Sequence, residues 1–210
     1  FVQSVLGASP TQAGVTVTPM LLGWVACSIF GSRILLKVGY RRLSIIGTSI
    51  FFVGASLLAL FGAGANRIFV MVFVTLMGMG MGLSIPAYVI AVQTTVERRH
   101  LGTATSMLQF SRSMGGTLGV SVMGAALSAR LAANLNAAGL DLSLISQLLD
   151  PLSSSGGVVE SGGRLAMANA IHLVFLIALI AATLGWIVSI FTPRKELKDD
   201  ITTIAPAIAD

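Results

Sequence analysis

Five long apolar runs occupy most of this 210-residue chain, and they restrict it to folds that cross a membrane. Each run has roughly 18–25 residues, the length that a helix needs to cross ~30 Å of hydrocarbon. The expected spans cover residues 13–30, 43–61, 68–92, 103–127 and 167–191. Only 10% of the residues are charged and the mean hydropathy is +0.90, so the chain cannot cover a water-facing surface. The predicted fold class is all-α, a polytopic membrane bundle of about five helices.

The basic residues between these runs fall mainly on alternate sides, which predicts the orientation. One side holds nine of the thirteen Lys and Arg residues: Arg33, Lys37, Arg41, Arg42, Arg98, Arg99, Arg194, Lys195 and Lys198. The opposite side holds Arg67, Arg130 and Arg164. Because basic loops stay cytoplasmic, we expect the C-terminus inside and the plasma membrane, as in a bacterial inner membrane, as the location. The net charge of +5 is then a topology signal, and nucleic acid is not an expected partner.

The chain divides into a transmembrane bundle, residues 1–192, and a cytoplasmic tail, residues 193–210. The outer loop 131–166 has apolar residues at helical spacing between 142 and 149, which predicts a short interfacial helix. The sequence begins at Phe1, without an initiator Met or a signal peptide, and the number of spans is odd. We therefore expect a fragment of a longer protein.

Arg112 is the charged residue that lies inside an expected span. It is about nine residues into the fourth span, roughly 13 Å from the inner end at helical rise. A charge at such a depth costs at least ~2.5–3.5 kcal/mol, so the side chain must face protein or water, or snorkel to the interface. Its side of the helix also carries Gln109, Gly115, Gly116, Gly119 and Met123. We expect Arg112 to point into the bundle, either as a substrate-path or gating charge or as a structural arginine.

Other residues within the spans are weaker candidates for binding or packing. Three neutral polar side chains could hydrogen-bond a substrate: Tyr88, Gln93 and Gln109. Glycines at short helical spacings predict close contacts between helices, at Gly78, Gly82, Gly115, Gly116 and Gly119. Numerous methionines make an adaptable apolar surface, which fits a promiscuous pocket or ordinary packing.

Chemistry other than transport has little support in the residues. All eight Asp and Glu residues lie in loops or the tail, and Cys27 is the single cysteine. We therefore expect no catalytic residues, no metal and no cofactor. Proton coupling normally uses an intramembrane carboxylate or a His relay, so a proton carrier is expected outside these residues.

The inner loop 32–42 resembles the G-x-L-x-D-R-x-G-R-R loop of the major facilitator superfamily. The residues that carry the likeness are Gly39, Arg41, Arg42 and, as the basic residue, Lys37. Ser32 replaces the first Gly. Leu36 replaces the Asp on which the charge-relay gate depends in the copy of this loop from the first half of these transporters.

Longer stretches resemble the fourteen-helix drug/proton antiporters of the EmrB/QacA type. They are Gly7-Ala8-Ser9-Pro10 with Pro19, Gly78 to Gln93, Gly102 to Gly119 with Arg112 in an R-x-x-G-G pattern, and Ile171 to Phe175. The resemblance implies that the five spans are helices ten to fourteen of a transporter whose N-terminal half is missing here. It also implies proton-coupled export of drugs or other amphipathic small molecules by alternating access, and hence antibiotic resistance.

Several alternatives to multidrug export stay open at this stage. Export of an endogenous metabolite would use the same architecture, and the sequence does not separate the two. A membrane scaffold or sensor that transports nothing is the rival from another class. A channel would show a pore helix or rings of polar residues, which this sequence lacks, although a fragment could omit them.

Overall fold

The computed structural model describes residues 10–61, 66–137 and 161–192 of the chain. These residues form α1 (Pro10–Val38), α2 (Tyr40–Phe61), α3 (Arg67–Thr95), the short 3-10 helix η1 (Arg98–His100), α4 (Leu101–Ala137) and α6 (Ser161–Ile190). Five of these helices are long and apolar enough to cross a membrane, and the described ranges contain no strand. The prediction of an all-α membrane bundle with about five spanning helices is confirmed.

Helix α3 packs closely against both α1 and α2 because glycines lie where the helices meet. A β-carbon at Gly80 of α3 would lie 2.5 Å from the backbone nitrogen of Phe51 and 2.6 Å from the carbonyl oxygen of Gly47. On the α1 side, a β-carbon at Gly78 would collide with the carbonyl oxygen of Met20, and one at Gly82 with that of Trp24. Such contacts leave room only for hydrogen, so these glycines set the distance between the helix backbones.

Helix α6 packs against α2 through polar and aromatic contacts. The indole nitrogen of Trp186 donates a 2.8 Å hydrogen bond to Ser49 Oγ, and its ring stacks on Phe52 with a 5.5 Å centroid separation. At the end of the same seam, Arg41 Nη2 donates to the carbonyl oxygen of Ile190 at 3.2 Å. Since the C-terminal carbonyls of a helix lack partners within it, Arg41 caps the end of α6.

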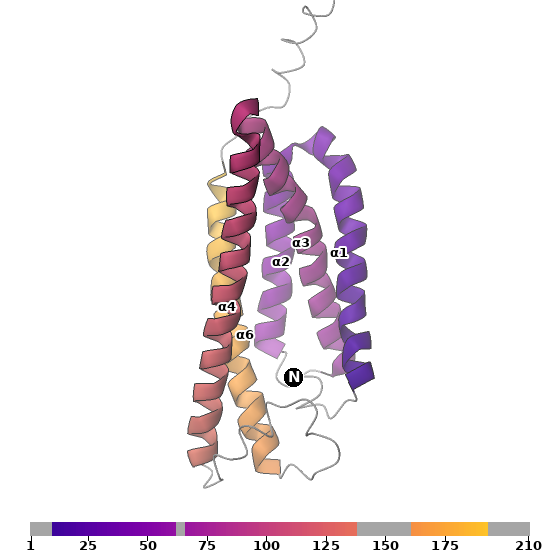
Figure 1. The fold of residues 1–210 in the computed structure, drawn as a ribbon. Helices are drawn as coiled ribbons and strands as arrows, with labels where there is room; N and C mark the ends of the chain where they lie inside the picture. The colour runs from indigo at the N-terminus through magenta and orange to yellow at the C-terminus, as the bar shows by residue number, and fades with distance from the viewer. Residues whose placement is uncertain (1–9, 62–65, 138–160, 193–210) are drawn as a thin grey trace, which may run out of the picture.

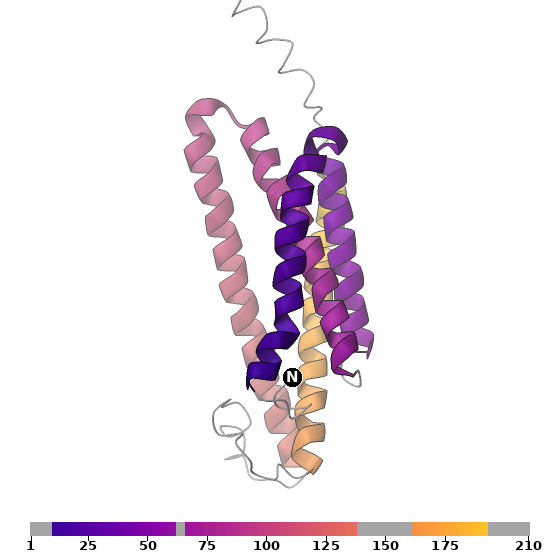
Figure 2. The same ribbon diagram turned by 90° about the vertical axis from the view of Figure 1, so that its right-hand side faces the viewer.

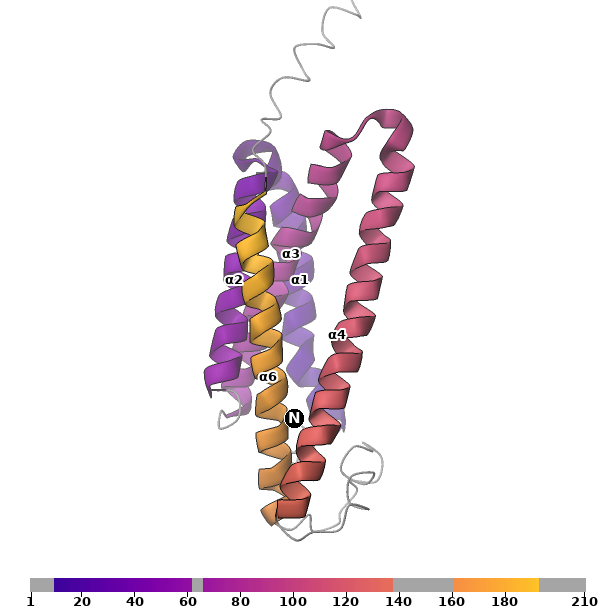
Figure 3. The ribbon, with the colours of Figure 1, turned by 90° about the vertical axis from the view of Figure 1, so that its left-hand side faces the viewer.

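Helix α4 stands apart from α1, α2 and α3 along most of its length (Figures 1, 2 and 3). Its main neighbour is α6, and the two lie side by side at the end of the bundle where Leu131 and Ala170 are fully buried. Toward the opposite end of the bundle, where η1 connects α3 to α4, helices α4 and α6 diverge (Figure 3). The middle of α4 is therefore exposed within the described chain.

The helices are longer than the apolar runs, and one predicted loop is almost absent. Helix α1 continues through Arg33 and Lys37 to Val38, and α2 begins at Tyr40, so the expected inner loop shrinks to Gly39. The reason is that hydropathy marks the hydrocarbon core, whereas helical hydrogen bonding continues beyond it. Gly39 has a φ of 82°, a left-handed conformation that glycine adopts without the steric cost of a side chain.

The outer loop expected at 131–166 is also shorter, because α4 runs to Ala137 and α6 begins at Ser161. Residues 128–137 are rich in Ala and Leu, which favour helix although Ser128, Arg130 and the two asparagines interrupt the apolar run. The interfacial helix expected near 142–149 lies outside the described residues, as does the tail 193–210.

Candidate functional site

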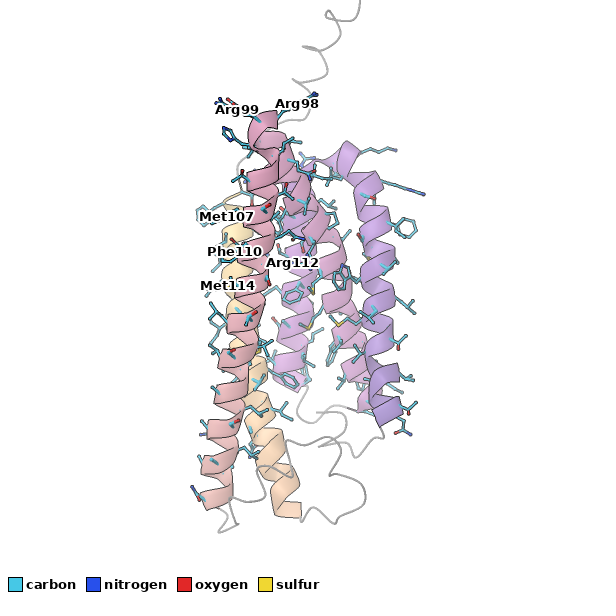
Figure 4. The ribbon with its side chains drawn as sticks, in the orientation of Figure 1. Arg98, Arg99, Met107, Phe110, Arg112 and Met114 are labelled. Carbon is cyan, nitrogen blue, oxygen red and sulfur yellow. The ribbon has the colours of Figure 1, made fainter. Side chains whose placement is uncertain are left out.

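The candidate site is the polar side of α4, built around Arg112. This residue lies eleven positions after the first residue of α4, so it is about 16 Å along the helix axis. Figure 4 shows Arg112 on the side of α4 that faces α2 and α3, whereas Met107, Phe110 and Met114 lie on the other side. Helical spacing agrees, because these three residues cluster roughly opposite Arg112 at 3.6 residues per turn. Arg112 therefore faces the rest of the bundle, whereas these three apolar side chains face away from it.

The guanidinium of Arg112 has no hydrogen bond or ion pair within the described chain, and its side chain is exposed. A cation at this depth in hydrocarbon is costly, and it is retained where water, a carboxylate or backbone carbonyls can solvate it. Glu97 is the acidic residue of the described ranges, and its carboxylate is 2.7 Å from Arg99 Nε in η1. Arg112 therefore needs a partner that the described residues do not supply.

Gln109 lies one helical turn before Arg112 and is likewise exposed. Its amide has no hydrogen-bond partner among the described residues, so both polar groups are available to a ligand. Because residues three apart on a helix are neighbours, the structure brings these two candidates together on α4.

The two other polar candidates, Tyr88 and Gln93, belong to α3 and are not grouped with Arg112 by any contact. Tyr88 is half-buried and Gln93 is exposed, and neither has a hydrogen bond within the described ranges. Gln93 continues the side of α3 on which Gly78 and Gly82 meet α1, so this face is in part a helix-packing surface. The two side chains are also five residues apart, which places them on different faces of α3.

The five glycines expected to pack helices divide into two groups. Gly78 and Gly82 approach the α1 backbone closely, as described above. In contrast, a β-carbon at Gly115 or Gly116 would meet no atom within 4 Å, and one at Gly119 would meet only Met123 of the same helix, at 3.8 Å. The expected contacts at these three positions are thus not formed within the described chain, because the middle of α4 has no neighbour there.

The basic residues of the motif have separate roles in the structure. Arg41 is bound to α6, and its Nε is buried. Lys37 and Arg42 are exposed and have no partner among the described residues. Arg33, Lys37, Arg41 and Arg42 lie at the same end of the bundle as η1, which contains Arg98 and Arg99 (Figures 1 and 4).

Sequence reasoning missed two groups of residues with specific contacts. Arg67, counted only as a basic residue on the outer side, donates from Nε to Thr16 Oγ1 at 3.0 Å and from Nη2 to the Gln12 carbonyl at 2.7 Å, which ties α3 to α1. Trp186 and Ser49 were not singled out at all, since no local pattern reports a contact between residues 137 positions apart. Within the described ranges, no group of three or more His, Cys, Asp or Glu residues could hold a metal ion.

Comparison with known proteins gives a consistent result over nearly the whole chain. The model of the Major Facilitator Superfamily matches residues 1–206. Multidrug resistance protein 3 of Bacillus subtilis (strain 168) is 32% identical over 94% of this chain and 41% of its own length. Multidrug transporter protein MdtP of the same organism is 33% identical over 62% of this chain and 24% of its own length.

A fungal relative, the aspyridones efflux protein of Neocamarosporium betae, is 30% identical over 98% of this chain and 37% of its own length. The chain thus spans well under half the length of each of these three relatives. No solved structure gives a significant match.

Proposed function

Because the chain belongs to the Major Facilitator Superfamily, a family of membrane transporters, we propose that it is the C-terminal part of a proton-coupled exporter of drugs or other amphipathic small molecules. Its five membrane-spanning helices and its transporter-named relatives place it among integral membrane transporters rather than enzymes. The observation that carries the proposal is Arg112, a cation about 16 Å along a spanning helix and without a partner in the described chain. A polar path beside α4 would solvate this charge.

In this proposal, Arg112 and Gln109 line the substrate path, and Tyr88 and Gln93 offer hydrogen bonds from α3. The guanidinium stabilises anionic groups that form when the transporter releases protons. In this way the protonation state of the transporter is coupled to substrate binding. The apolar residues around the path accept the hydrophobic part of an amphipathic substrate. The proton-carrying carboxylate belongs to the part of the transporter that precedes this chain.

The same proposal gives the middle of α4 a partner. Its glycines leave space for the backbone of another helix, as Gly78 and Gly82 do for α1. We assign that space to helices of the N-terminal part of the transporter, which would bury the exposed middle of α4. This assignment agrees with the length of the relatives, of which this chain covers 41% or less.

Export can be tested directly in cells that produce the full-length protein. We expect these cells to lose a fluorescent amphipathic cation such as ethidium faster than cells without the protein, and an uncoupler of the proton gradient to abolish the difference. Equal retention in both cell types, at confirmed membrane abundance, would argue against drug export.

Export of an endogenous metabolite is the second candidate. The observation in its favour is the relative named as an aspyridones efflux protein, which matches 98% of this chain. Cells that retain the dye but secrete a metabolite only when the protein is present would favour this candidate.

The proposed orientation places the basic end of the bundle and the C-terminus in the cytoplasm. It rests on six basic residues that the structure gathers at one end, Arg33, Lys37, Arg41, Arg42, Arg98 and Arg99. In a protein without other reactive cysteines, such as a Cys27→Ala background, we expect Asn66→Cys to react with a membrane-impermeant thiol reagent added outside. We expect His100→Cys to react only after the membrane is opened, and the reverse pattern would overturn the orientation.

A further inference from the structure

One face of α2 combines an unpaired cation with a row of exposed apolar side chains. Arg42 is followed on this face by Ile46, Val53 and Leu60, whose exposed fractions are 47%, 49% and 71%. Intervals of four, seven and seven residues keep all four within a narrow sector at 3.6 residues per turn. We call these four residues the α2 outer face.

The surroundings of α2 show what borders this face. Gly47 and Gly54, about a third of a turn away around the helix, meet the backbone of α3. Ser49 is seven residues after Arg42 and accepts the hydrogen bond from Trp186, so the face borders α6 and is turned away from α3. Figures 2 and 3 both show α2 on the side of the bundle away from α4. Ile46, Val53 and Leu60 are branched apolar side chains that stay exposed beside the α6 contact, so they suit lipid chains.

Arg42 lies at the depth of the lipid headgroups. Helix α2 has 22 residues, so its length of about 33 Å matches the hydrocarbon thickness, and Arg42 is two residues from its start. The apolar part of the outer face then lies alongside acyl chains, with the guanidinium at their polar end.

Adjacent arginines of the motif differ sharply in what they contact. Arg41 donates to the Ile190 carbonyl and its Nε is buried, so its side chain holds the end of α6 against α2. Arg42 is exposed and has no hydrogen bond or ion pair in the described chain, and the same is true of Lys37 on the other side of the Gly39 break. Two free cations at one break between helices attract phosphate groups of the membrane surface.

We propose that the α2 outer face binds an anionic phospholipid, whose phosphate contacts Arg42 and whose acyl chain lies along Ile46, Val53 and Leu60. A guanidinium forms charge-assisted hydrogen bonds to phosphate oxygens, and it attracts a lipid of net negative charge more strongly than one whose phosphate is offset by a choline cation. The proposal rests on the orientation given above only for the choice of leaflet, since both leaflets of a symmetric lipid disc offer the same headgroups.

The test measures binding of phosphatidylglycerol, and of zwitterionic phosphatidylcholine as the reference of zero net charge, to the full-length protein by native mass spectrometry. We expect phosphatidylglycerol to bind more tightly, and Arg42→Gln to weaken its binding about fivefold, the effect of losing one interfacial cation. Binding of phosphatidylcholine, whose phosphate is offset by its choline cation, should weaken less. Arg42→Lys, which keeps the charge, should retain most of the preference.

Arg41→Gln is the matched control, one residue away with the same change in charge. We expect it to lower the thermal unfolding midpoint equally in discs of either lipid, because it removes the cap of α6 rather than a lipid contact. The proposal is overturned if Arg42→Gln leaves the preference for phosphatidylglycerol intact, or if it destabilises the protein equally in both lipids, which would mean that Arg42 contacts protein. The cysteine labelling reports the orientation independently, so an inverted topology would change the leaflet without mimicking either result.

Discussion

Replacing Arg112 by alanine in the full-length transporter is expected to reduce export at least tenfold while the amount of protein in the membrane stays the same. The side chain is exposed and has no partner in the described chain, so its loss removes no contact within this part of the fold. What it removes is the positive charge beside the proposed substrate path. A loss of about 1.4 kcal/mol of stabilisation in the rate-limiting state corresponds to a factor of ten, which is modest for a charge at this depth.

Two variants separate this role from a general effect of charge. Arg112→Lys keeps the charge but loses the planar donor array, so we expect intermediate export. Arg130→Ala removes an exposed arginine from the C-terminal part of the same helix, and we expect normal export. The measurement is the initial rate of ethidium loss from cells, normalised to membrane abundance. Normal export by Arg112→Ala would refute the assigned role.

The largest expected effect on folding comes from Gly80→Ala. The added β-carbon would lie 2.5 Å from the nitrogen and 2.8 Å from the Cα of Phe51, and 2.6 Å from the carbonyl oxygen of Gly47. All three atoms belong to the backbone of α2, so no side chain can move aside and the two helices must separate. Overpacking of this kind costs about 3 kcal/mol, at the upper end of the usual range.

Gly185→Ala provides the control, since a β-carbon there meets no atom within 4 Å. Alanine favours helix over glycine by roughly 0.5–1 kcal/mol, so this variant should be as stable as the parent or slightly more stable. Thermal unfolding in detergent, followed by size-exclusion chromatography, measures both variants. Equal midpoints for Gly80→Ala and the parent would show that α2 and α3 are not held at the distance described.

The positions of the membrane helices could be predicted from the sequence, whereas their ends and neighbours could not. Hydropathy located all five helices because burial in lipid requires continuous apolar segments. It did not extend α1 through Arg33 and Lys37, because these residues leave the hydrocarbon while the helix continues. Gly39 was recognised as part of a motif, but its left-handed φ, and its role as the break between α1 and α2, required coordinates.

The glycines show most clearly why the candidate site could be predicted only in part. Gly78 with Gly82 and Gly115 with Gly119 have the same spacing, yet the first pair contacts α1 and the second pair has no neighbouring helix in the described chain. Spacing reports the shape of one helix surface, but the contact depends on which helix lies opposite. For the same reason, the sequence could not distinguish Arg41, which binds α6, from the exposed Arg42.

Transport by the purified full-length protein in liposomes is the most direct test of the central proposal. The measurement is ethidium movement against its concentration gradient, with an imposed pH gradient and without one. The proposal predicts accumulation only when the pH gradient is present, accompanied by movement of protons in the opposite direction and strongly reduced by Arg112→Ala. Ethidium movement equal to that in protein-free liposomes, or accumulation that is independent of the pH gradient, would contradict it.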